Sequence, residues 1–379
     1  MTLSPGTTTG DRYVRQRILP GFGHEGQAAL SAARVLVIGA GGLGSSVIPS
    51  LAGAGVGTIG IVDFDTVEPS NLHRQLIHRT EDAGSLKTAS AAARVAALNP
   101  AVTVVEHAEQ FSIDNALDLC GAYDLVIDGS DNFVTRYLVN DAAVLAGIPA
   151  VWGAVSQFGG QAGVAWASRG PHYRDLFPTP PSDGSVLSCA IGGVFPTTVA
   201  VIGSIMASEA IKIITGIGQP LIGRVVTFDA LTGSFRELAY APDPDAAPIT
   251  SLVSIDDEAA TEGRSPESDV RAAPLRTVTA QELAAELASD TPPALLDVRE
   301  QWEIEVATLP GAISIPLGEL AGAISSLEGT ESLVVYCHHG VRSAHALGLL
   351  RQSGMNDARH LEGGIDAWAT TVDQTMDRY

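Results

Sequence analysis

Residues 35–44 read Val-Leu-Val-Ile-Gly-Ala-Gly-Gly-Leu-Gly, an apolar strand pattern that runs directly into a cluster of glycines. A helical pattern of small residues follows, and then a second apolar run at residues 59–62. Glycines between a strand and a helix let the backbone approach phosphate groups, and the helix start supplies unpaired N–H groups. Asp63 ends the second run, where a carboxylate can bind ribose hydroxyls. The pattern predicts a nucleotide site and leaves NAD, FAD and ATP open.

The segments that follow extend this unit. Short apolar runs at residues 125–127 and 150–151 are separated by helical patterns such as those at 87–98 and 135–145. Strands that alternate with helices favour a parallel sheet covered on both faces. We therefore expect an α/β, Rossmann-like domain.

The composition changes between residues 241 and 274. Proline, Asp, Glu, Ser and Ala dominate this stretch, and neither helical nor strand periodicity is present. Such a segment is typical of a flexible linker. We expect it to join a first domain, residues 1–240, to a smaller α/β domain, residues 275–379. The second domain has strand patterns at 295–298 and 333–336 and helical patterns at 280–288 and 342–353.

Charge and cysteine usage exclude several classes of protein. Acidic residues number 43 and basic residues 22, which gives a net charge of −21. This charge repels nucleic acid and anionic membrane surfaces and favours basic partners. The three cysteines, Cys120, Cys189 and Cys337, form no Cys-x-x-Cys pair, so a disulfide framework is not expected. Cys120 is expected in the core.

The N-terminal residues contain no apolar signal-peptide core. The most apolar stretch, residues 186–208, is interrupted by two glycines and a proline and continues into charged residues. We therefore expect a cytoplasmic protein without a membrane span.

Polar residues after the apolar runs distinguish among the nucleotides. Residues 70–75 read Ser-Asn-Leu-His-Arg-Gln, Lys87 follows, and Asp131 and Asn132 come after the run at 125–127. A dinucleotide keeps its pyrophosphate intact and needs few cations. ATP attacked at its α-phosphate needs cations and a carboxylate for Mg²⁺ as pyrophosphate leaves. Each residue alone is more often a solvated surface residue, but together they favour ATP.

These elements, in this order, resemble the MoeB/ThiF adenylyltransferases, bacterial relatives of the ubiquitin-activating enzymes. The resemblance covers about residues 12–240 and includes the Asp63-Phe64-Asp65 and Asp128–Asn132 segments. It implies nucleotide contacts from Gly42, Asp63, Ser70, Asn71, Arg74, Lys87, Asp131 and Asn132.

The same resemblance implies further expectations. Asp131 would be the carboxylate linked to Mg²⁺. Arg15 would reach the ATP of a partner subunit, which implies a homodimer. The substrate would be the C-terminal Gly-Gly carboxylate of a ubiquitin-like sulfur-carrier protein, activated as an acyl-adenylate. Cys189 lies where some members of the family have a conjugating cysteine, although a small buried residue is an equally good interpretation.

The chain departs from this family at a zinc site. Family members often carry two Cys-x-x-Cys pairs, which would fall near residues 171–175 and 242–248 here, and both pairs are missing. His172 and Asp175 remain, but without thiolates we expect no structural zinc.

Residues 337–343, Cys-His-His-Gly-Val-Arg-Ser, follow the strand pattern at 333–336 and lead into a helix. A loop of this kind points N–H groups at the sulfur and favours the thiolate and its persulfide. Together with matching segments at 295–300, 310–316 and 361–368, the loop resembles a rhodanese domain. The resemblance implies Cys337 as the sulfur-carrying residue and Arg342 as the residue that closes the loop. His338 and His339 are expected to line it, and Asp297 and Arg299 to be structural.

The fused layout resembles the MoeZ-type adenylyltransferase/sulfurtransferases. It implies that Cys337, loaded by a persulfide donor such as a cysteine desulfurase, delivers sulfur to the activated carrier to give a thiocarboxylate, for molybdopterin synthesis or a related sulfur pathway. Two alternatives remain. An NAD-dependent oxidoreductase would bind nicotinamide without pyrophosphate exchange, and a non-catalytic scaffold would bind carriers without exchange or thiocarboxylate.

Overall fold

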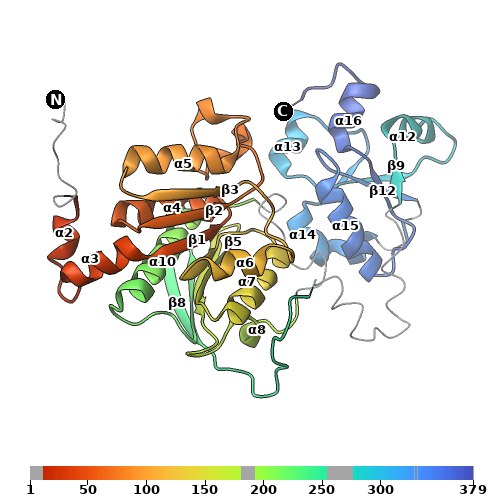
Figure 1. Ribbon diagram of the computed structural model, residues 1–379. Helices are drawn as coiled ribbons and strands as arrows, with labels where there is room; N and C mark the ends of the chain where they lie inside the picture. Colours follow the sequence, from red (N-terminus) through yellow and green to blue (C-terminus); the bar gives the residue numbers. More distant parts are fainter. Residues whose placement is uncertain (1–11, 181–192, 254–275, 328, 331, 379) are drawn as a thin grey trace. The chain divides into compact units, whose positions relative to one another are not determined.

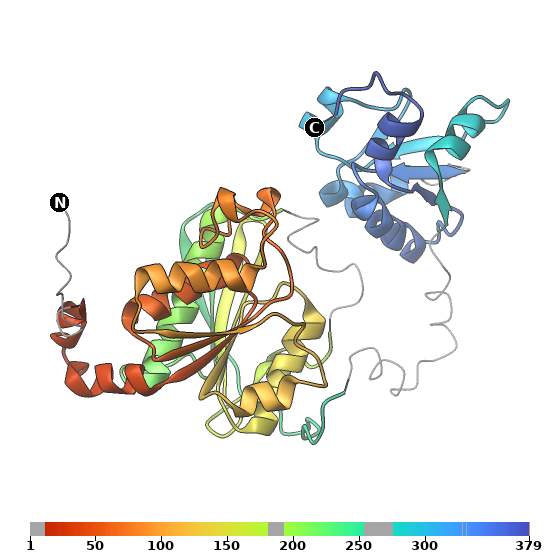
Figure 2. The same ribbon diagram turned by 45° about the horizontal axis from the view of Figure 1, so that its top comes forward.

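The computed structural model describes residues 12–180, 193–253, 276–327, 329–330 and 332–378. They form two compact units. The first consists of residues 12–180 and 193–253, and the second begins at residue 276. Figures 1 and 2 show that each unit has a central sheet with helices on both faces.

The first unit is built on an eight-stranded sheet with the order β3-β2-β1-β4-β5-β6-β7-β8. Strands β1 to β5 are mutually parallel, as the sequence predicts. The strands are β1 (Arg34–Ile38), β2 (Thr58–Val62), β3 (Thr103–His107), β4 (Leu125–Asp128), β5 (Ala150–Ser156), β6 (Gly159–Ala165), β7 (Arg224–Asp229) and β8 (Ser234–Ala239).

The last three strands, which the sequence analysis did not predict, make the sheet mixed. Strands β6, β7 and β8 each run antiparallel to their neighbours. Only Gln157 and Phe158 separate β5 from β6, and a two-residue connection can join only antiparallel strands. Gln157 adopts φ 49° in this turn. The side chains of β8 are mostly exposed, so this edge of the sheet is not covered on both faces.

Alternate residues of each strand pack into separate cores. Val35 and Val37 of β1 contact one cluster, whereas Leu36 and Ile38 contact the other. The first cluster includes residues of α3, α4, α5 and α10, and the second includes residues of α6, α7 and α8. The helices are α2 (Val14–Arg17), α3 (Gly23–Ala32), α4 (Gly42–Ala54), α5 (Lys87–Leu98), α6 (Ala116–Gly121), α7 (Phe133–Ala146), α8 (Tyr173–Leu176) and α10 (Pro196–Thr215), with 3-10 turns η1 (Pro69–Asn71) and η2 (Thr80–Asp82).

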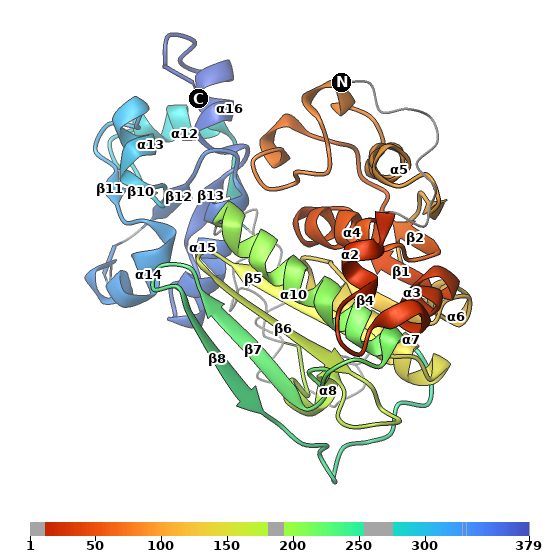
Figure 3. The same ribbon diagram turned by 90° about the vertical axis from the view of Figure 1, so that its left-hand side faces the viewer.

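Helix α10 is the one helix among the described residues that is long and apolar enough to cross a bilayer. Val199, Ile202 and Met206 on this helix are buried in the first core cluster. Figure 3 shows α10 lying along β5 and β6, which it contacts. This packing is that of a core helix.

The second unit has a parallel five-stranded sheet with the order β11-β10-β12-β13-β9. Helices α14 and α15 contribute to one core cluster, and α12 and α16 to the other. Its elements are β9 (Thr277–Val278), α12 (Ala280–Leu287), β10 (Ala294–Asp297), α13 (Gln301–Val306), β11 (Ile313–Ser314), α14 (Leu317–Ala323), η4 (Ile324–Leu327), β12 (Leu333–Tyr336), α15 (Val341–Gln352), β13 (Arg359–Leu361) and α16 (Gly364–Thr371).

A buried ion pair joins the end of β10 to the loop after it. Asp297 and Arg299 are both fully buried, and the Arg299 Nη2 to Asp297 Oδ2 distance is 2.6 Å. Arg299 also donates to the carbonyl oxygen of Ala307 at 2.7 Å. The pair therefore holds the segment between β10 and β11 against the sheet.

We predict that Asp297→Asn destabilises the second unit by about 3–5 kcal/mol, because it leaves the buried guanidinium without its counter-charge. Urea dependence of hydrogen exchange in residues 276–378 measures the change. Asp357→Asn is the matched control, since the Asp357 side chain is 89% exposed and its pair with Arg276 contributes about 0–1 kcal/mol. Equal effects of the two substitutions would contradict the prediction.

Candidate active sites

The nucleotide-site candidates of the first unit gather at one edge of its sheet. Strands β2, β1 and β4 are adjacent and parallel, so their carboxyl ends lie together. The glycine loop follows β1, Asp63 follows β2, and Asp131 follows β4 by a short loop. This edge is where ligands bind in open α/β sheets.

The glycine loop is tightly packed against its neighbours. Gly39 has φ 88°, and a Cβ on it would lie 3.0 Å from the carbonyl oxygen of Gly129. A Cβ on Gly44, in the first turn of α4, would lie 2.2 Å from the carbonyl oxygen of Gly39. The chain can therefore turn from β1 into α4 only with glycine at these positions. The turn leaves the N–H groups at the start of α4 near the sheet edge.

Asp63 is a buried carboxylate tied to the glycine loop. Its Oδ2 accepts a hydrogen bond from the Ala40 N–H at 2.8 Å, and its Oδ1 accepts one from the Asp65 N–H at 2.9 Å. Burial raises the pKa of Asp63, while these hydrogen bonds and nearby Lys87 oppose the rise. Each oxygen retains acceptor capacity for a ribose hydroxyl.

His78, which no sequence motif marks, also holds the glycine loop. Its Nε2 lies 2.9 Å from the Ala40 carbonyl oxygen, and its Nδ1 lies 2.8 Å from Ser90 Oγ. Burial lowers the pKa of His78. Because a carbonyl oxygen can only accept, Nε2 donates to Ala40, while the Ser90 hydroxyl donates to Asp82 Oδ2 at 2.8 Å. Both backbone groups of Ala40 are thus fixed.

The cations lie on the segment between β2 and α5. Lys87 is buried at the first position of α5, with its Nζ 2.7 Å from Asp65 Oδ2. Arg74 donates from Nη2 to Asn71 Oδ1 at 2.8 Å. Ser70 Oγ is held by the Glu68 carboxylate at 3.3 Å. The structure thus links Lys87 to β2 and Arg74 to Asn71.

Several buried polar atoms near this edge have no hydrogen-bond partner within the described residues. Gln75 is 4% exposed and its Oε1 is unsatisfied, while its Nε2 faces Gly41. Ser45 Oγ, on α4, and Thr88 Oγ1, on α5, are also unsatisfied. Unsatisfied buried polar atoms are uncommon, and they indicate a place where a polar ligand completes the hydrogen bonding.

Asp131 and Asn132 lie exposed in the loop before α7. Asn132 caps that helix by accepting a hydrogen bond from the Thr135 N–H at 2.8 Å. The loop is anchored from within the core by Arg136, which lies 3.3 Å from Asp128 and donates to the Ser130 carbonyl oxygen at 3.1 Å.

Arg15 lies at the end of α4 that is farthest from the glycine loop. Among the described residues, it is the one adenylation-site candidate placed there. Its neighbour Gln16 donates to the carbonyl oxygen of Ala54, the last residue of α4, at 3.0 Å. The glycine loop is at the other end of this 13-residue helix, roughly 20 Å away. Within one chain Arg15 therefore does not reach the nucleotide edge.

The two segments where the family resemblance would place Cys-x-x-Cys pairs are joined here by hydrogen bonds. Asp175 Oδ2 accepts from the His172 N–H at 2.7 Å, and its Oδ1 accepts from the Asp243 N–H at 2.9 Å. His172 and Asp175 belong to no three-residue group of metal ligands among the described residues. This donor set does not fit a structural zinc. Asp243 therefore lies against the first unit, as does Leu252, which packs against its second core cluster.

Cys337 directly follows β12, the central strand of the second sheet. The thiol is 1% exposed. Its Sγ accepts hydrogen bonds from the Gly340 N–H at 3.1 Å and the Ser343 N–H at 3.4 Å. Gly340 makes the turn possible with φ 95°. Two N–H groups at a helix start stabilise a negatively charged sulfur.

Arg342 binds a carboxylate at the edge of this loop. Its two terminal nitrogens lie 2.5 and 2.6 Å from the carboxylate oxygens of Glu303, which is buried on α13. This bidentate pair fixes the start of α15 relative to α13. Glu303 is a residue that the sequence analysis missed.

The remaining cysteines differ in their status. Cys120 is fully buried, as expected, and burial raises the pKa of its thiol to about 12. It is therefore protonated and unreactive at neutral pH. Cys189 lies outside the described residues.

Comparison with known proteins identifies both units. Residues 13–248 match the model of the ThiF family. The chain belongs to the ThiF family. Residues 279–371 of this ThiF-family chain match the rhodanese-like domain. The combination makes it an adenylyltransferase and a sulfurtransferase, as in its relatives.

Two relatives cover nearly the whole ThiF-family chain, and a third covers part of it. A probable adenylyltransferase/sulfurtransferase MoeZ of Mycobacterium tuberculosis is 46% identical over 97% of this chain and 95% of its own length. The MOCS3-2 adenylyltransferase and sulfurtransferase of Zea mays is 39% identical over 97% of this chain and 80% of its own length. A sulfur carrier protein adenylyltransferase of Thermus thermophilus is 52% identical over 62% of this chain and 88% of its own length.

Crystal structures of Escherichia coli MccB share the fold of the first unit. One of them has a TM-score of 0.56 and 21% identity, over 64% of this chain and 75% of MccB. ATP use follows from membership of the ThiF family. It supports the ATP interpretation of the glycine loop over the nicotinamide alternative.

We predict that Gly44→Ala abolishes ATP binding, because the added Cβ collides with the Gly39 carbonyl oxygen and opens the glycine loop. Gly53→Ala is the matched control on the same helix. Its Cβ would have no atom within 4 Å, and alanine favours the helix by about 0.5–1 kcal/mol. Isothermal titration with ATP compares the two. ATP affinity equal to wild type in Gly44→Ala would contradict the role of the loop.

Proposed function

We propose that the first unit adenylates the C-terminal Gly-Gly carboxylate of a ubiquitin-like sulfur-carrier protein and that the second unit delivers sulfur to it. The observation that carries the proposal is the presence of both sites on one chain. In the first unit, fixed N–H groups and cations lie at the carboxyl edge of the sheet. In the second unit, the Cys337 sulfur accepts hydrogen bonds from two backbone N–H groups. The name of the Thermus relative supports a sulfur carrier as the partner.

In the first step, a carboxylate oxygen of the carrier attacks the α-phosphorus of ATP, and pyrophosphate leaves. Asp63 binds the ribose, and Gly42, Ser70, Asn71 and Asn132 complete the nucleotide contacts. Arg74 and Lys87 offset the negative charge that grows on the phosphate oxygens. Because the Lys87 ammonium group is bound to Asp65, it is already placed before ATP arrives. The product is an acyl-adenylate.

Asp131 would hold Mg²⁺. An exposed carboxylate fits this ion, since Mg²⁺ in nucleotide sites keeps waters and substrate phosphates as most of its ligands. When bound, Mg²⁺ neutralises charge on the departing pyrophosphate. We propose that the first unit binds no zinc, because both carboxylate oxygens of Asp175 accept hydrogen bonds from backbone N–H groups.

In the second step, the outer sulfur of a Cys337 persulfide attacks the acyl carbon and displaces AMP. The carrier is then joined to Cys337 through an acyl disulfide. A second thiol attacks the Cys337 sulfur and forms a disulfide with it, and the carrier thiocarboxylate leaves. Cys189 is our candidate for this thiol. A persulfide donor such as a cysteine desulfurase reloads Cys337 in the cytoplasm, after an external thiol has reduced the disulfide.

A homodimer would bring Arg15 to the reaction. Since Arg15 lies at the far end of α4 in its own chain, a second copy must supply it to the ATP. Arg342 has a different role, because its pair with Glu303 supports the loop around Cys337.

The decisive experiment separates the two half-reactions. We predict that Cys337→Ala retains ATP–pyrophosphate exchange with candidate Gly-Gly carriers at about the wild-type rate, because its effect is confined to the second unit. Thiocarboxylate formation, followed by carrier mass, is expected to disappear. Cys120→Ala is the control that keeps both activities, since that thiol is buried and protonated. Absence of exchange with every carrier would refute adenylation, and thiocarboxylate made by Cys337→Ala would remove that residue from the mechanism.

Mixed dimers test the role of Arg15. We predict that Arg15→Ala and Lys87→Ala homodimers are each inactive in exchange. Random mixing restores about a quarter of the wild-type sites, because half of the dimers are mixed and each has one intact site. Mixing Lys87→Ala with Arg74→Ala is the control without recovery, since both residues act within their own chain. Recovery in neither mixture would rule out a contribution of Arg15 across the dimer.

A further inference from the structure

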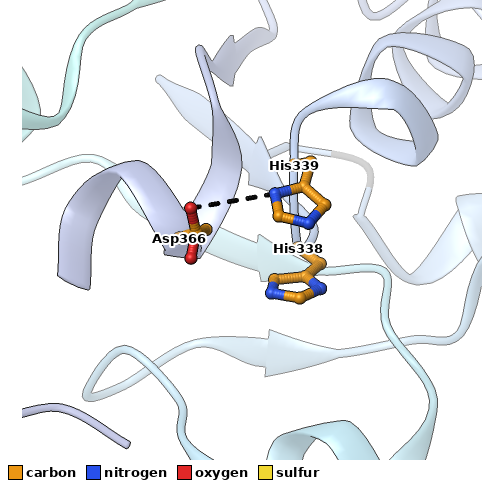
Figure 4. Close-up of side chains that lie close together, drawn as sticks. All are labelled: His338, His339 and Asp366. Carbon is orange, nitrogen blue, oxygen red and sulfur yellow. Dashed lines mark ion pairs between the residues drawn. The ribbon is translucent and has the colours of Figure 1, made fainter. Parts of the chain in front are cut away.

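Two histidines and an aspartate that the proposed reaction does not use lie beside the Cys337 loop. His338 and His339 follow Cys337 in the loop, and Asp366 lies in the first turn of α16 (Figure 4). One ligand atom of each residue lies within 4.8 Å of the ligand atoms of the other two. Among the described residues, this is the one group of three His, Cys, Asp or Glu side chains so arranged.

The backbone holds the two segments together. The Ile365 N–H donates to the Cys337 carbonyl oxygen at 2.8 Å, and the Asp366 N–H donates to the His338 carbonyl oxygen at 3.1 Å. Gly364 has no room for a side chain, since a Cβ would lie 2.3 Å from the His338 carbonyl oxygen. The start of α16 is therefore fixed against the loop, and the carboxylate of Asp366 faces His339 (Figure 4).

His339 and Asp366 lie close enough to share one ion. His339 Nδ1 lies 3.9 Å from Asp366 Oδ2, which is within reach of a bridging ion, and the His339 side chain is 63% exposed. Arg378 pairs with the other oxygen, Oδ1, at 2.8 Å. The two imidazole rings are stacked with their centroids 3.9 Å apart. Because imidazole lone pairs lie in the ring plane, the exposed His339 ring must rotate for both rings to face one ion.

We propose that His338, His339 and Asp366 bind a divalent transition-metal ion of the Zn²⁺ type at the mouth of the Cys337 loop. Two imidazoles and one carboxylate are ligands that Zn²⁺ accepts, and three protein ligands leave a coordination position open. The Arg378 guanidinium lowers the affinity through its positive charge. The site is therefore weaker than a structural zinc site, and the ion exchanges.

Metal binding changes access to Cys337. The two histidines are the residues that directly follow the cysteine, and an ion held between them and α16 covers the loop. Reaction of Cys337 with small electrophiles therefore slows when the ion binds. Adenylation in the first unit is unaffected. Metal binding at this site does not depend on the proposed function. A slower transfer of sulfur to a carrier in the presence of the ion would rest on that function.

Zn²⁺ titration of the full chain in buffer without thiols or chelators tests the site. We expect one Zn²⁺ per chain at this site by equilibrium dialysis, and an affinity at least about tenfold weaker in His339→Gln and in Asp366→Asn. His339→Gln changes an exposed side chain, so it keeps the fold. His24→Ala, an exposed histidine of the first unit, is the matched control with unchanged affinity. Equal affinity in wild type and both variants, or no binding at all, overturns the proposal.

Alkylation of Cys337 by iodoacetamide tests the effect on access. Peptide mass spectrometry follows this cysteine separately from the other two. We expect the wild-type rate to fall at least about tenfold at saturating Zn²⁺, and the rate in His339→Gln to stay unchanged at the same Zn²⁺ concentration. A wild-type rate that does not respond to bound Zn²⁺ overturns the inferred control of access. Neither readout requires ATP or a carrier, so failure of the proposed function would not affect them.

Discussion

Backbone N–H groups at the start of a helix that follows a parallel strand provide the electrostatic basis of both sites. In the first unit the helix is α4, whose start is exposed to the sheet edge because glycines allow the sharp turn after β1. In the second it is α15, whose loop directs two N–H groups at the Cys337 sulfur. Such donors are fixed before any ligand arrives, so little reorganisation is needed when negative charge develops. One arrangement, a parallel strand followed by a helix, thus serves phosphate chemistry in one unit and sulfur chemistry in the other.

The sequence predicted the elements whose pattern is local and strong. Strands β1, β2 and β4 are continuous apolar runs because both of their faces are buried, and helix α5 was predicted with its observed bounds. Strands β6 to β8 were missed. Strand β6 has three glycines among its seven residues, and the side chains of β8 are mostly exposed, so a continuous apolar run marks neither strand.

The candidate site divides in the same way. Motif residues such as Asp63 and Lys87 could be named as candidates because the order of the sequence motifs marks them. His78 could not, since its partner Ala40 lies 38 residues away and only the folded chain brings them together. Glu303 is a similar case, 39 residues from Arg342. Residues that support a site through distant backbone contacts carry no spacing signal. Arg15 became a candidate only through the family resemblance, because its own chain places it at the far end of α4 from the glycine loop.

The burial of Cys337 has a consequence for how the protein withstands oxidation. A thiol that is 1% exposed offers peroxide and other solutes in bulk water almost no surface to attack. Adding one sulfur atom extends the side chain by about 2 Å, the length of a sulfur–sulfur bond. On the proposed mechanism, the uncharged thiol is thus largely shielded, and the added outer sulfur lies closer to the surroundings. Oxidation is then expected mainly while the protein carries its cargo.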